Sequence, residues 1–354
     1  MTDATAAEAL QSIRTSEDVR AACLEFRGTA QRLREEIGRV LVGQEQTVTS
    51  VLVALFANWH VLLEGVPGLG KTLLVRTLGQ ALGLRFSRVQ FTPDLMPADI
   101  IGTQIVLEDQ RTRQREFSFR PGPLFTQILL ADEINRASPK SQSALLEAMQ
   151  ERSITVGGTT HKLEQPFLVL ATQNPIEQEG TYPLPEAQLD RFLIKVIVPS
   201  AEQDALNEIV ARTTGVLQTT NAVKPVLSAA HIAWAQALAR LVVVAPHVQD
   251  YAVRLTLATQ PGGAFSPAEC EHLIAVGASP RGAQAILSCA KVMALLGGRA
   301  AVSTQDIAAV AMPALRHRVV RSFEAEAGGT TTDSIVQQLI DATPAQLQPM
   351  ERAE

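Results

Sequence analysis

The sequence has few cysteines, few aromatic residues and no excess of positive charge. Its 354 residues include three cysteines, Cys23, Cys270 and Cys289. They lack the spacing of metal ligands, and we expect them to be small buried residues in a reducing compartment. Aromatic residues make up 4% of the chain and hydrophobic residues 46%, as in soluble α-rich or α/β proteins. The formal net charge of −5 argues against a permanently basic nucleic-acid-binding face, although it leaves a local basic loop open.

Two further absences concern targeting. Residues Met1–Thr5 carry no basic segment followed by an apolar one, so we expect no secretory signal. The most apolar stretches, Val51–Leu63 and Leu241–Ala245, are too short or too interrupted to span a bilayer. We therefore expect a cytoplasmic protein, and its length predicts two or three domains.

What the sequence does contain is a complete phosphate-binding loop. The apolar segment His60–Leu63 predicts a buried strand, and Leu73–Leu78 predicts a helix, which is the context that the motif requires. The loop glycines let backbone N–H groups point inward, and the helix N-terminus adds partial positive charge beneath bound phosphates. Lys71 is expected to reach the β- and γ-phosphates, and the Thr72 hydroxyl to ligate Mg²⁺. The predicted nucleotide-binding residues of the loop are Gly65, Pro67, Gly68, Leu69, Gly70, Lys71 and Thr72.

Short apolar runs alternate with helical segments in the first half of the chain. This pattern predicts further strands of a parallel sheet at Arg85–Phe91, Ile128–Ile134, Phe167–Asn174 and Phe192–Val198. Past Pro199 we expect no strand, only Ala-rich helices over residues 201–213, 228–245, 248–260, 281–296 and 303–320. The prediction is an α/β nucleotide-binding domain over residues 41–199, after a helical segment 1–40 and before an all-helical domain 200–325 and a tail 326–354.

Two segments of the first domain have the pattern of β-hairpin insertions. Thr103–Leu107 and Arg115–Phe119 flank a charged turn, 108–114. Ser153–Val156 and His161–Leu163 flank a neutral turn, 157–160. Neither hairpin belongs to a minimal phosphate-binding sheet, and each alone is equally compatible with simple loop decoration.

Polar side chains end two of the predicted strands. Asp132 and Glu133 follow an apolar strand, which places both at the edge of the sheet where the phosphate-binding loop opens. We expect Asp132 to hold Mg²⁺ opposite Thr72, and Glu133 to act as the general base that polarises the attacking water. Asn174 ends the next strand and is expected to orient that water, unless it only caps a turn before Pro175.

At this point the chain resembles a known family. The phosphate-binding loop, the acidic pair and Asn174, followed by a helical domain, are similar to the AAA+ ATPases. Finer phrases narrow the resemblance to the MoxR family, over about residues 35–342: Val42-Gly43-Gln44-Glu45, Ala131-Asp132-Glu133-Ile134-Asn135-Arg136-Ala137, Ala171-Thr172-Gln173-Asn174-Pro175, Pro185-Glu186-Ala187-Gln188-Leu189-Asp190-Arg191-Phe192, Ala278-Ser279-Pro280-Arg281-Gly282 and Leu315-Arg316-His317-Arg318. The fold that it implies is an AAA+ P-loop parallel-sheet domain with two β-hairpin inserts, followed by an all-helical lid.

The resemblance also implies roles for single residues. Asn174 matches sensor 1, and Arg281 matches sensor 2 in the first turn of a helix that Ser279 can cap. The alternative for Arg281 is a solvated arginine. Val42 and Gly43 match the segment beside the adenine.

Arg191 matches the position of the arginine finger in the family. Its guanidinium is expected to reach the γ-phosphate bound by a neighbouring subunit and to neutralise charge during phosphoryl transfer. The alternative is an ion pair within the chain, with Asp190 or Glu186. Arg136 is the second candidate for the role between subunits.

The function implied is that of an ATP-driven, Mg²⁺-dependent remodelling machine with a chaperone-like role towards a partner protein complex. It would work as a homo-oligomer, in a ring that is a hexamer, with its two hairpins facing the pore or the client. A separate protein with a von Willebrand factor type A domain is the expected partner. An AAA+ nucleic-acid motor is the main alternative, and the mixed charges of 108–113 argue against it because a strand-tracking tip should be basic or aromatic. A small-molecule kinase would leave Asn174, Arg191 and Arg281 unexplained.

Overall fold

A computed structural model describes residue 13 and residues 15–66, 68–108, 115–175, 181–214 and 223–345. Its contacts divide these residues into two compact units, one formed by parts of 31–192 and 196–234, the other by parts of 15–30, 193–195 and 235–345. Helices α2 (Ser16–Gly38) and α9 (Ala229–Leu241) have residues in both units. In the described part of the chain, no helix is both long enough and apolar enough to cross a membrane.

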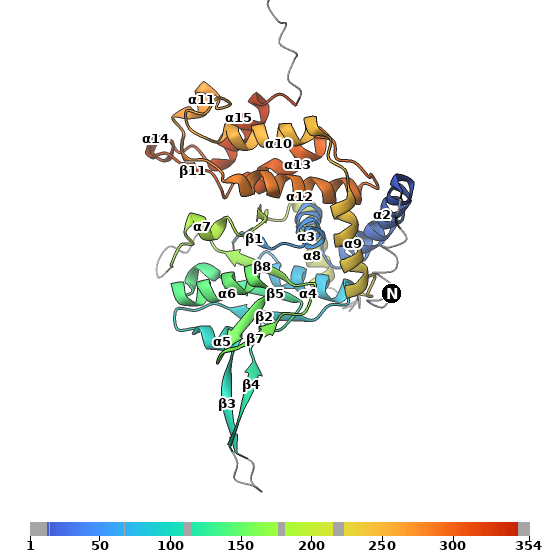
Figure 1. Cartoon of the computed structure of the whole chain (residues 1–354), viewed down its shortest axis with the longest axis vertical. Coiled ribbons are helices and arrows are strands. Elements are labelled where there is room, and N and C mark those ends of the chain that lie inside the picture. The colour runs from blue at the N-terminus through green and yellow to red at the C-terminus, as the bar shows by residue number, and fades with distance from the viewer. Residues whose placement is uncertain are drawn as a thin grey trace, which may run out of the picture. The chain divides into compact units, whose positions relative to one another are not determined.

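The first unit is built on a five-stranded sheet (Figure 1). The strand order is β2-β5-β8-β1-β9, and parallel pairing joins β2 to β5, β5 to β8 and β8 to β1. The strands are β1 (Val61–Glu64), β2 (Phe86–Gln90), β5 (Ile128–Asp132), β8 (Leu168–Gln173) and β9 (Ile194–Ile197). Four of them lie within the predicted apolar runs and β1 extends one residue beyond its run, to Glu64, so the α/β prediction is confirmed.

Helices of the first unit connect and cover these strands. They are α3 (Glu45–Ala57), α4 (Lys71–Ala81), α5 (Pro97–Ile101), η1 (Ile134–Arg136), α6 (Pro139–Glu151), α7 (Glu186–Leu189) and α8 (Gln203–Thr214). Helix α6 begins where its sequence requires, because the Ser138 hydroxyl accepts a hydrogen bond from the Ser141 N–H and Pro139 occupies the first turn.

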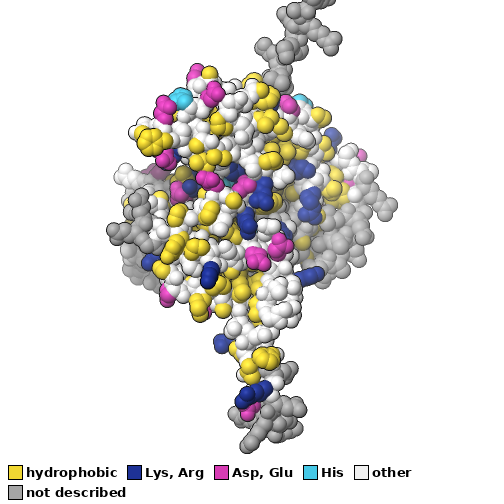
Figure 2. All heavy atoms as spheres, turned by 60° about the vertical axis from the view of Figure 1, so that its left-hand side comes forward, with side chains coloured by type: hydrophobic (Ala, Val, Ile, Leu, Met, Phe, Trp, Pro, Cys, Tyr) yellow, Lys and Arg dark blue, Asp and Glu magenta, His cyan; other side chains and the backbone are white. Residues whose placement is uncertain are grey.

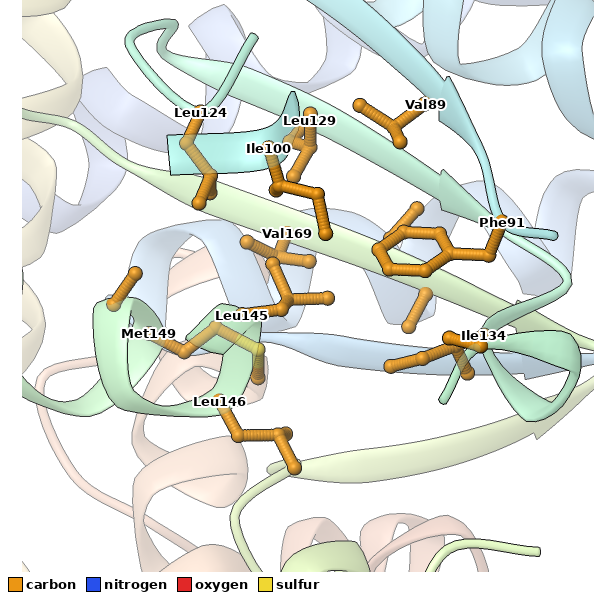
Figure 3. Close-up of a cluster of buried hydrophobic side chains, with 14 of the residues drawn as sticks. Val89, Phe91, Ile100, Leu124, Leu129, Ile134, Leu145, Leu146, Met149 and Val169 are labelled. Carbon is orange, nitrogen blue, oxygen red and sulfur yellow. The ribbon is translucent and has the colours of Figure 1, made fainter. Parts of the chain in front are cut away.

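A hydrophobic core fills the space between α6 and one face of the sheet. Leu145 and Met149 from α6 meet Val89, Leu129 and Val169, which come from three neighbouring strands (Figure 3). Because side chains alternate along a strand, the residues next to these in sequence point to the opposite face. That alternation places polar side chains of β2, β5 and β8 together on the other face, at the carboxyl edge.

Two antiparallel hairpins are inserted in this unit, as predicted. The long hairpin pairs β3 (Gly102–Glu108) with β4 (Arg115–Pro121) and extends away from the sheet (Figure 1). The short hairpin pairs β6 (Ser153–Val156) with β7 (Thr159–Lys162). The predicted four-residue turn of this hairpin is wrong, because Thr159 and Thr160 pair as part of β7. Two glycines form the turn, and both have the positive φ that such a turn requires, 57° at Gly157 and 80° at Gly158.

The second unit is mainly helical. Its elements are α10 (Pro246–Ala258), α11 (Ala268–Glu271), β10 (Ile274–Val276), α12 (Pro280–Leu296), α13 (Thr304–Leu315), β11 (Val320–Arg321), α14 (Phe323–Ala327) and α15 (Thr332–Ala342). The expectation of no strand past residue 199 is wrong within this unit. Strands β10 and β11 form a short antiparallel pair. Helix α13 ends at Leu315, earlier than the predicted end at residue 320. So short a pair has no clear alternation in the sequence. The predicted domain boundaries at 40, 199 and 325 stay predictions.

Candidate functional site

The phosphate-binding loop connects β1 to α4. Gly68 and Gly70 have positive φ, 88° and 72°, a conformation that L side chains rarely adopt, and helix α4 begins at the next residue, Lys71. The Lys71 ammonium donates a hydrogen bond to the Gly65 carbonyl at 2.7 Å, which holds it over the loop. Thr72 is exposed in the first turn of α4. Pro67, also predicted for this site, lies outside the described residues.

A segment ahead of the sheet contacts the same loop. The Gln44 side-chain amide donates to the Leu69 carbonyl at 2.8 Å, so the Val42-Gly43 segment is tied to the phosphate-binding loop. Gly43 has φ 70° and lies close to Ala205 of α8, where a side chain would collide. Sequence reasoning quoted Gln44 but gave it no role.

The acidic pair lies at the carboxyl edge of β5. The Thr172 hydroxyl donates to Asp132 Oδ1 at 2.6 Å and accepts from the Glu133 N–H at 2.8 Å, so one buried side chain of β8 fixes both. Glu133 has φ 57° and ψ 50°, a left-handed conformation that costs a non-glycine residue about 1 kcal/mol or more. Such local strain persists only where the surroundings impose it, and the hydrogen bond from its N–H to Thr172 is one such constraint.

The loop and the acidic pair form one electrostatic site. Burial lowers the pKa of the Lys71 ammonium from its ordinary value, and the negative charges of Asp132 and Glu133 oppose that shift. Strands β1, β8 and β5 are parallel neighbours, so the loop that follows β1 and the carboxylates that end β5 share the same edge of the sheet. The sequence predicted this juxtaposition.

Residues of β2 complete the site, and sequence reasoning missed them. Gln90 donates to Glu133 Oε2 at 2.6 Å, and Arg88 Nη2 lies 2.7 Å from Asp132 Oδ2. Arg136 also donates to Glu133 Oε2, at 3.1 Å. A signal for Gln90 was present, because it is a polar residue at the end of a predicted parallel strand, as Asn174 is.

The remaining predicted residues lie at three places. Asn174 is buried directly after β8, whose last residue, Gln173, accepts a hydrogen bond from the Gly65 N–H at 3.3 Å; Asn174 therefore adjoins the phosphate-binding loop. Arg191 is half-buried, two residues after α7. Arg281 is exposed at the start of α12, where the Ser279 hydroxyl caps the helix as predicted. Arg281 belongs to the second compact unit, and its approach to a phosphate stays a prediction.

The side chains at the sheet edge fit a hard divalent cation. The Asp132 carboxylate and the Thr72 hydroxyl are oxygen donors, which Mg²⁺ prefers. Asp132 Oδ1 accepts a hydrogen bond from Thr172, and Oδ2 accepts two from Arg88, so a metal-bound water at Oδ2 would compete with the guanidinium. A bound Mg²⁺ would neutralise phosphate charge at this edge.

Comparisons with known proteins identify the domains that contain these residues. The model of the ATPase family associated with various cellular activities (AAA) matches residues 60–194, and the AAA lid domain model matches residues 267–339. Chaperone MoxR1 of Mycobacterium tuberculosis is 45% identical over 314 residues, which cover 88% of this chain and 81% of that protein. Protein MoxR of Paracoccus denitrificans is 34% identical over 325 residues, covering 86% of this chain and 91% of that protein.

A solved structure extends the likeness to the whole architecture. The crystal structure of a putative ATPase from Cytophaga hutchinsonii superimposes with a TM-score of 0.84 at 39% sequence identity, and the match covers 93% of this chain and 98% of that one. The identities and coverage, together with a nucleotide-binding domain followed by a lid, show the family. This chain belongs to the MoxR family of AAA ATPases.

Proposed function

We propose that this protein hydrolyses Mg-ATP and uses the energy to remodel, mature or activate a partner protein complex, in the manner of a chaperone. The observation that carries the proposal is that Lys71, in the loop after β1, and Asp132 with Glu133, at the end of β5, lie at the same carboxyl edge of the parallel sheet. A cation for the phosphates, a carboxylate for the metal ion and a second carboxylate for the water are the groups that phosphoryl transfer to water requires.

In this proposal each side chain has a distinct task. Lys71 and the loop amides bind the β- and γ-phosphates, and Mg²⁺ would be held by the Thr72 hydroxyl and, through water, by Asp132. Glu133 accepts the proton of the attacking water, which Asn174 orients. The left-handed backbone at Glu133 and its bonds from Gln90 and Arg136 support this role, because they hold the base in one orientation.

The two hairpins offer a route from the site to a client. Strand β4 leads into β5, which ends at Asp132, and β7 leads into β8, which precedes Asn174. Phe119 of β4 stacks on His161 of β7 with ring centroids 4.0 Å apart, and a Cβ at residue 157 would collide with Gln104 of β3. The short hairpin therefore contacts the base of the long one, and in this proposal a displacement of one strand end moves both hairpins.

The long hairpin has an apolar surface suited to a protein client. Val106 and Phe117 are directly opposite one another in the register and are 53% and 71% exposed. Hydrophobic and charged side chains lie next to one another along the projecting hairpin (Figure 2). Such an exposed apolar pair is a contact surface for unfolded or loosely packed segments of another protein.

Assembly into a ring, with a hexamer as the expected state, is part of the same proposal. It is supported by family membership and by the match of Arg191, half-buried two residues after α7, to the arginine finger of the family. MoxR1 is named a chaperone, and that name supports the remodelling role proposed here. A separate protein with a von Willebrand factor type A domain remains the proposed partner.

A nucleic-acid motor is the second candidate, and one observation favours it. Phe117 and Arg115 are both exposed on the same face of the long hairpin, which would suit base stacking and a phosphate contact. Arg115, however, is paired with Glu108 at 3.5 Å, which weakens its attraction for phosphate. Salt-dependent binding of this protein to single-stranded oligonucleotides would favour the motor over the chaperone.

Glu133→Gln tests the proposed function. The variant keeps the volume of the side chain and loses only the proton acceptor, so we expect normal binding of a fluorescent ATP analogue and a loss of phosphate release of at least a hundredfold. Glu164→Gln is the matched control, because Glu164 is an exposed carboxylate paired with Arg85 outside the site. Phosphate release at the wild-type rate by Glu133→Gln would refute the assigned base. Proteins that co-purify with the Glu133→Gln variant in ATP, and not in ADP, are the expected clients.

A further inference from the structure

Arg88 lies on the carboxylate that is expected to hold the metal ion. Its Nη2 is 2.7 Å and its Nε 3.2 Å from Asp132 Oδ2, while the other carboxylate oxygen is held by Thr172. Arg88 and Asp132 lie on the same face of the sheet, because Asp132 is the register partner of Gln90, two residues after Arg88.

The two oxygens of Asp132 differ in their access to solvent. Thr172, which holds Oδ1, is fully buried, whereas the Arg88 side chain over Oδ2 is 45% exposed. A hydrated cation must therefore approach Asp132 from the side where the guanidinium lies. Two cations cannot share one carboxylate oxygen without repulsion.

We propose that Arg88 is a positioning residue that holds Asp132 before the metal ion arrives and is displaced from it by the metal. This inference rests on the proposed Mg-ATP site. The ion pair keeps the Asp132 carboxylate oriented and its charge balanced in a site without metal. It also makes metal binding a competition with an internal cation.

Arg88 is coupled to the base through Gln90. A guanidinium only donates hydrogen bonds, so the Gln90 oxygen must face it, and Arg88 Nη2 lies 2.6 Å from Gln90 Oε1. This leaves the Gln90 Nε2–H for the Glu133 carboxylate, which only accepts. When Arg88 leaves Asp132, the constraint on the Gln90 amide and thus on Glu133 is released. Metal binding and the orientation of the base are then linked.

The test measures metal affinity separately from turnover. Mn²⁺ replaces Mg²⁺ as a paramagnetic probe, and its binding is titrated by electron paramagnetic resonance with a non-hydrolysable ATP analogue present. Removal of a partly exposed ion pair that competes with the metal should tighten Mn²⁺ binding by Arg88→Ala about fivefold.

Three matched variants separate charge from position. Arg88→Lys keeps a cation beside Asp132, so its Mn²⁺ affinity should stay near that of the wild type. Gln90→Ala should slow turnover and leave Mn²⁺ affinity within twofold. Arg85→Ala removes an exposed arginine just before the same strand, paired with Glu164 outside the site, and should change neither quantity.

The outcomes distinguish this inference from the function on which it rests. Mn²⁺ affinity of Arg88→Ala equal to or weaker than that of the wild type, in a protein that melts at the wild-type temperature, overturns the competition. Should Arg88→Ala melt early, Arg88→Gln provides the same comparison with a neutral side chain of similar reach. A wild-type protein that binds no Mn²⁺ with the ATP analogue refutes the proposed Mg-ATP site itself.

Discussion

His60 makes the stability of the nucleotide-binding unit dependent on pH. The imidazole directly precedes β1 and is 3% exposed; its Nδ1 accepts from the Val169 N–H at 3.0 Å, and its Nε2 lies 3.0 Å from the Met149 carbonyl. An Nε2–H that donates to Met149 while Nδ1 accepts is the neutral tautomer. Burial, together with the nearby charge of Arg152, lowers the pKa of His60 from 6.5 to about 4, although the Met149 bond opposes this.

The sign and size of the effect follow from this pKa. Since the folded protein binds the proton less tightly than the unfolded chain, the neutral imidazole stabilises the fold above pH 6.5, and that contribution is lost as the pH falls towards 4. The difference between 6.5 and about 4, at about 1.4 kcal/mol for each pKa unit, amounts to about 3 kcal/mol. This is a large part of the stability of a typical domain.

Urea unfolding at pH values from 4 to 8 measures the effect. The two tryptophans, Trp59 and Trp234, both belong to the first compact unit, so their fluorescence reports on the unit that contains His60. We compare the wild type with His60→Gln, whose amide does not titrate. The advantage of the wild type over this variant should shrink by about 3 kcal/mol between pH 7 and pH 4. A constant difference between wild type and His60→Gln across the range would refute the reasoning.

Two further predictions concern assembly and the hairpins. Subunits carrying Arg191→Ala should be inactive alone and should regain ATPase activity when mixed with Glu133→Gln subunits, because the finger and the base then come from different chains; phosphate release measures the recovery. Phe119→Ala removes the ring that stacks on His161, so spin labels on β3 and β7 should show a broader distance distribution by double electron–electron resonance.

Each of these two experiments has an outcome against it. In the mixture, intact rings without recovered activity would favour an ion pair of Arg191 within its own chain. For the hairpins, Phe117→Ala is the matched control, because Phe117 is exposed on the same strand as Phe119. Equal label distributions in Phe119→Ala and Phe117→Ala would show that the stack does not join the two hairpins.

Much of the architecture could be predicted from the sequence because the signals are local. Glycine is favoured at positions 68 and 70 because the backbone has a positive φ there, and the Ser279-Pro280 pair determines where α12 begins. Apolar runs of strand length lay where the five strands of the sheet are found. Because β5, β8 and β1 are parallel, Asp132 lies at the same sheet edge as the phosphate-binding loop, which is why a carboxylate at the end of an apolar strand could be assigned to the site.

Two predictions about short elements of the fold were wrong. The turn at Gly157-Gly158 was predicted two residues too long, since the polar residues after it, Thr159 and Thr160, resemble turn residues in composition but pair as a strand. The β10–β11 pair was missed because strands of three and two residues contain no measurable alternation. Tertiary contacts, rather than propensity, stabilise elements of this length.

By itself, the sequence determined the family, the phosphate-binding loop and the acidic pair, because each of these is a contiguous pattern with its own backbone requirement. Only the tertiary structure decided how the acidic pair is held. Arg88 and Gln90 lie more than forty residues before Glu133 in the chain, and they meet the carboxylates only because β2 pairs with β5 in this register. Side-chain partners across strands depend on register, and no local pattern encodes the register of distant parallel strands.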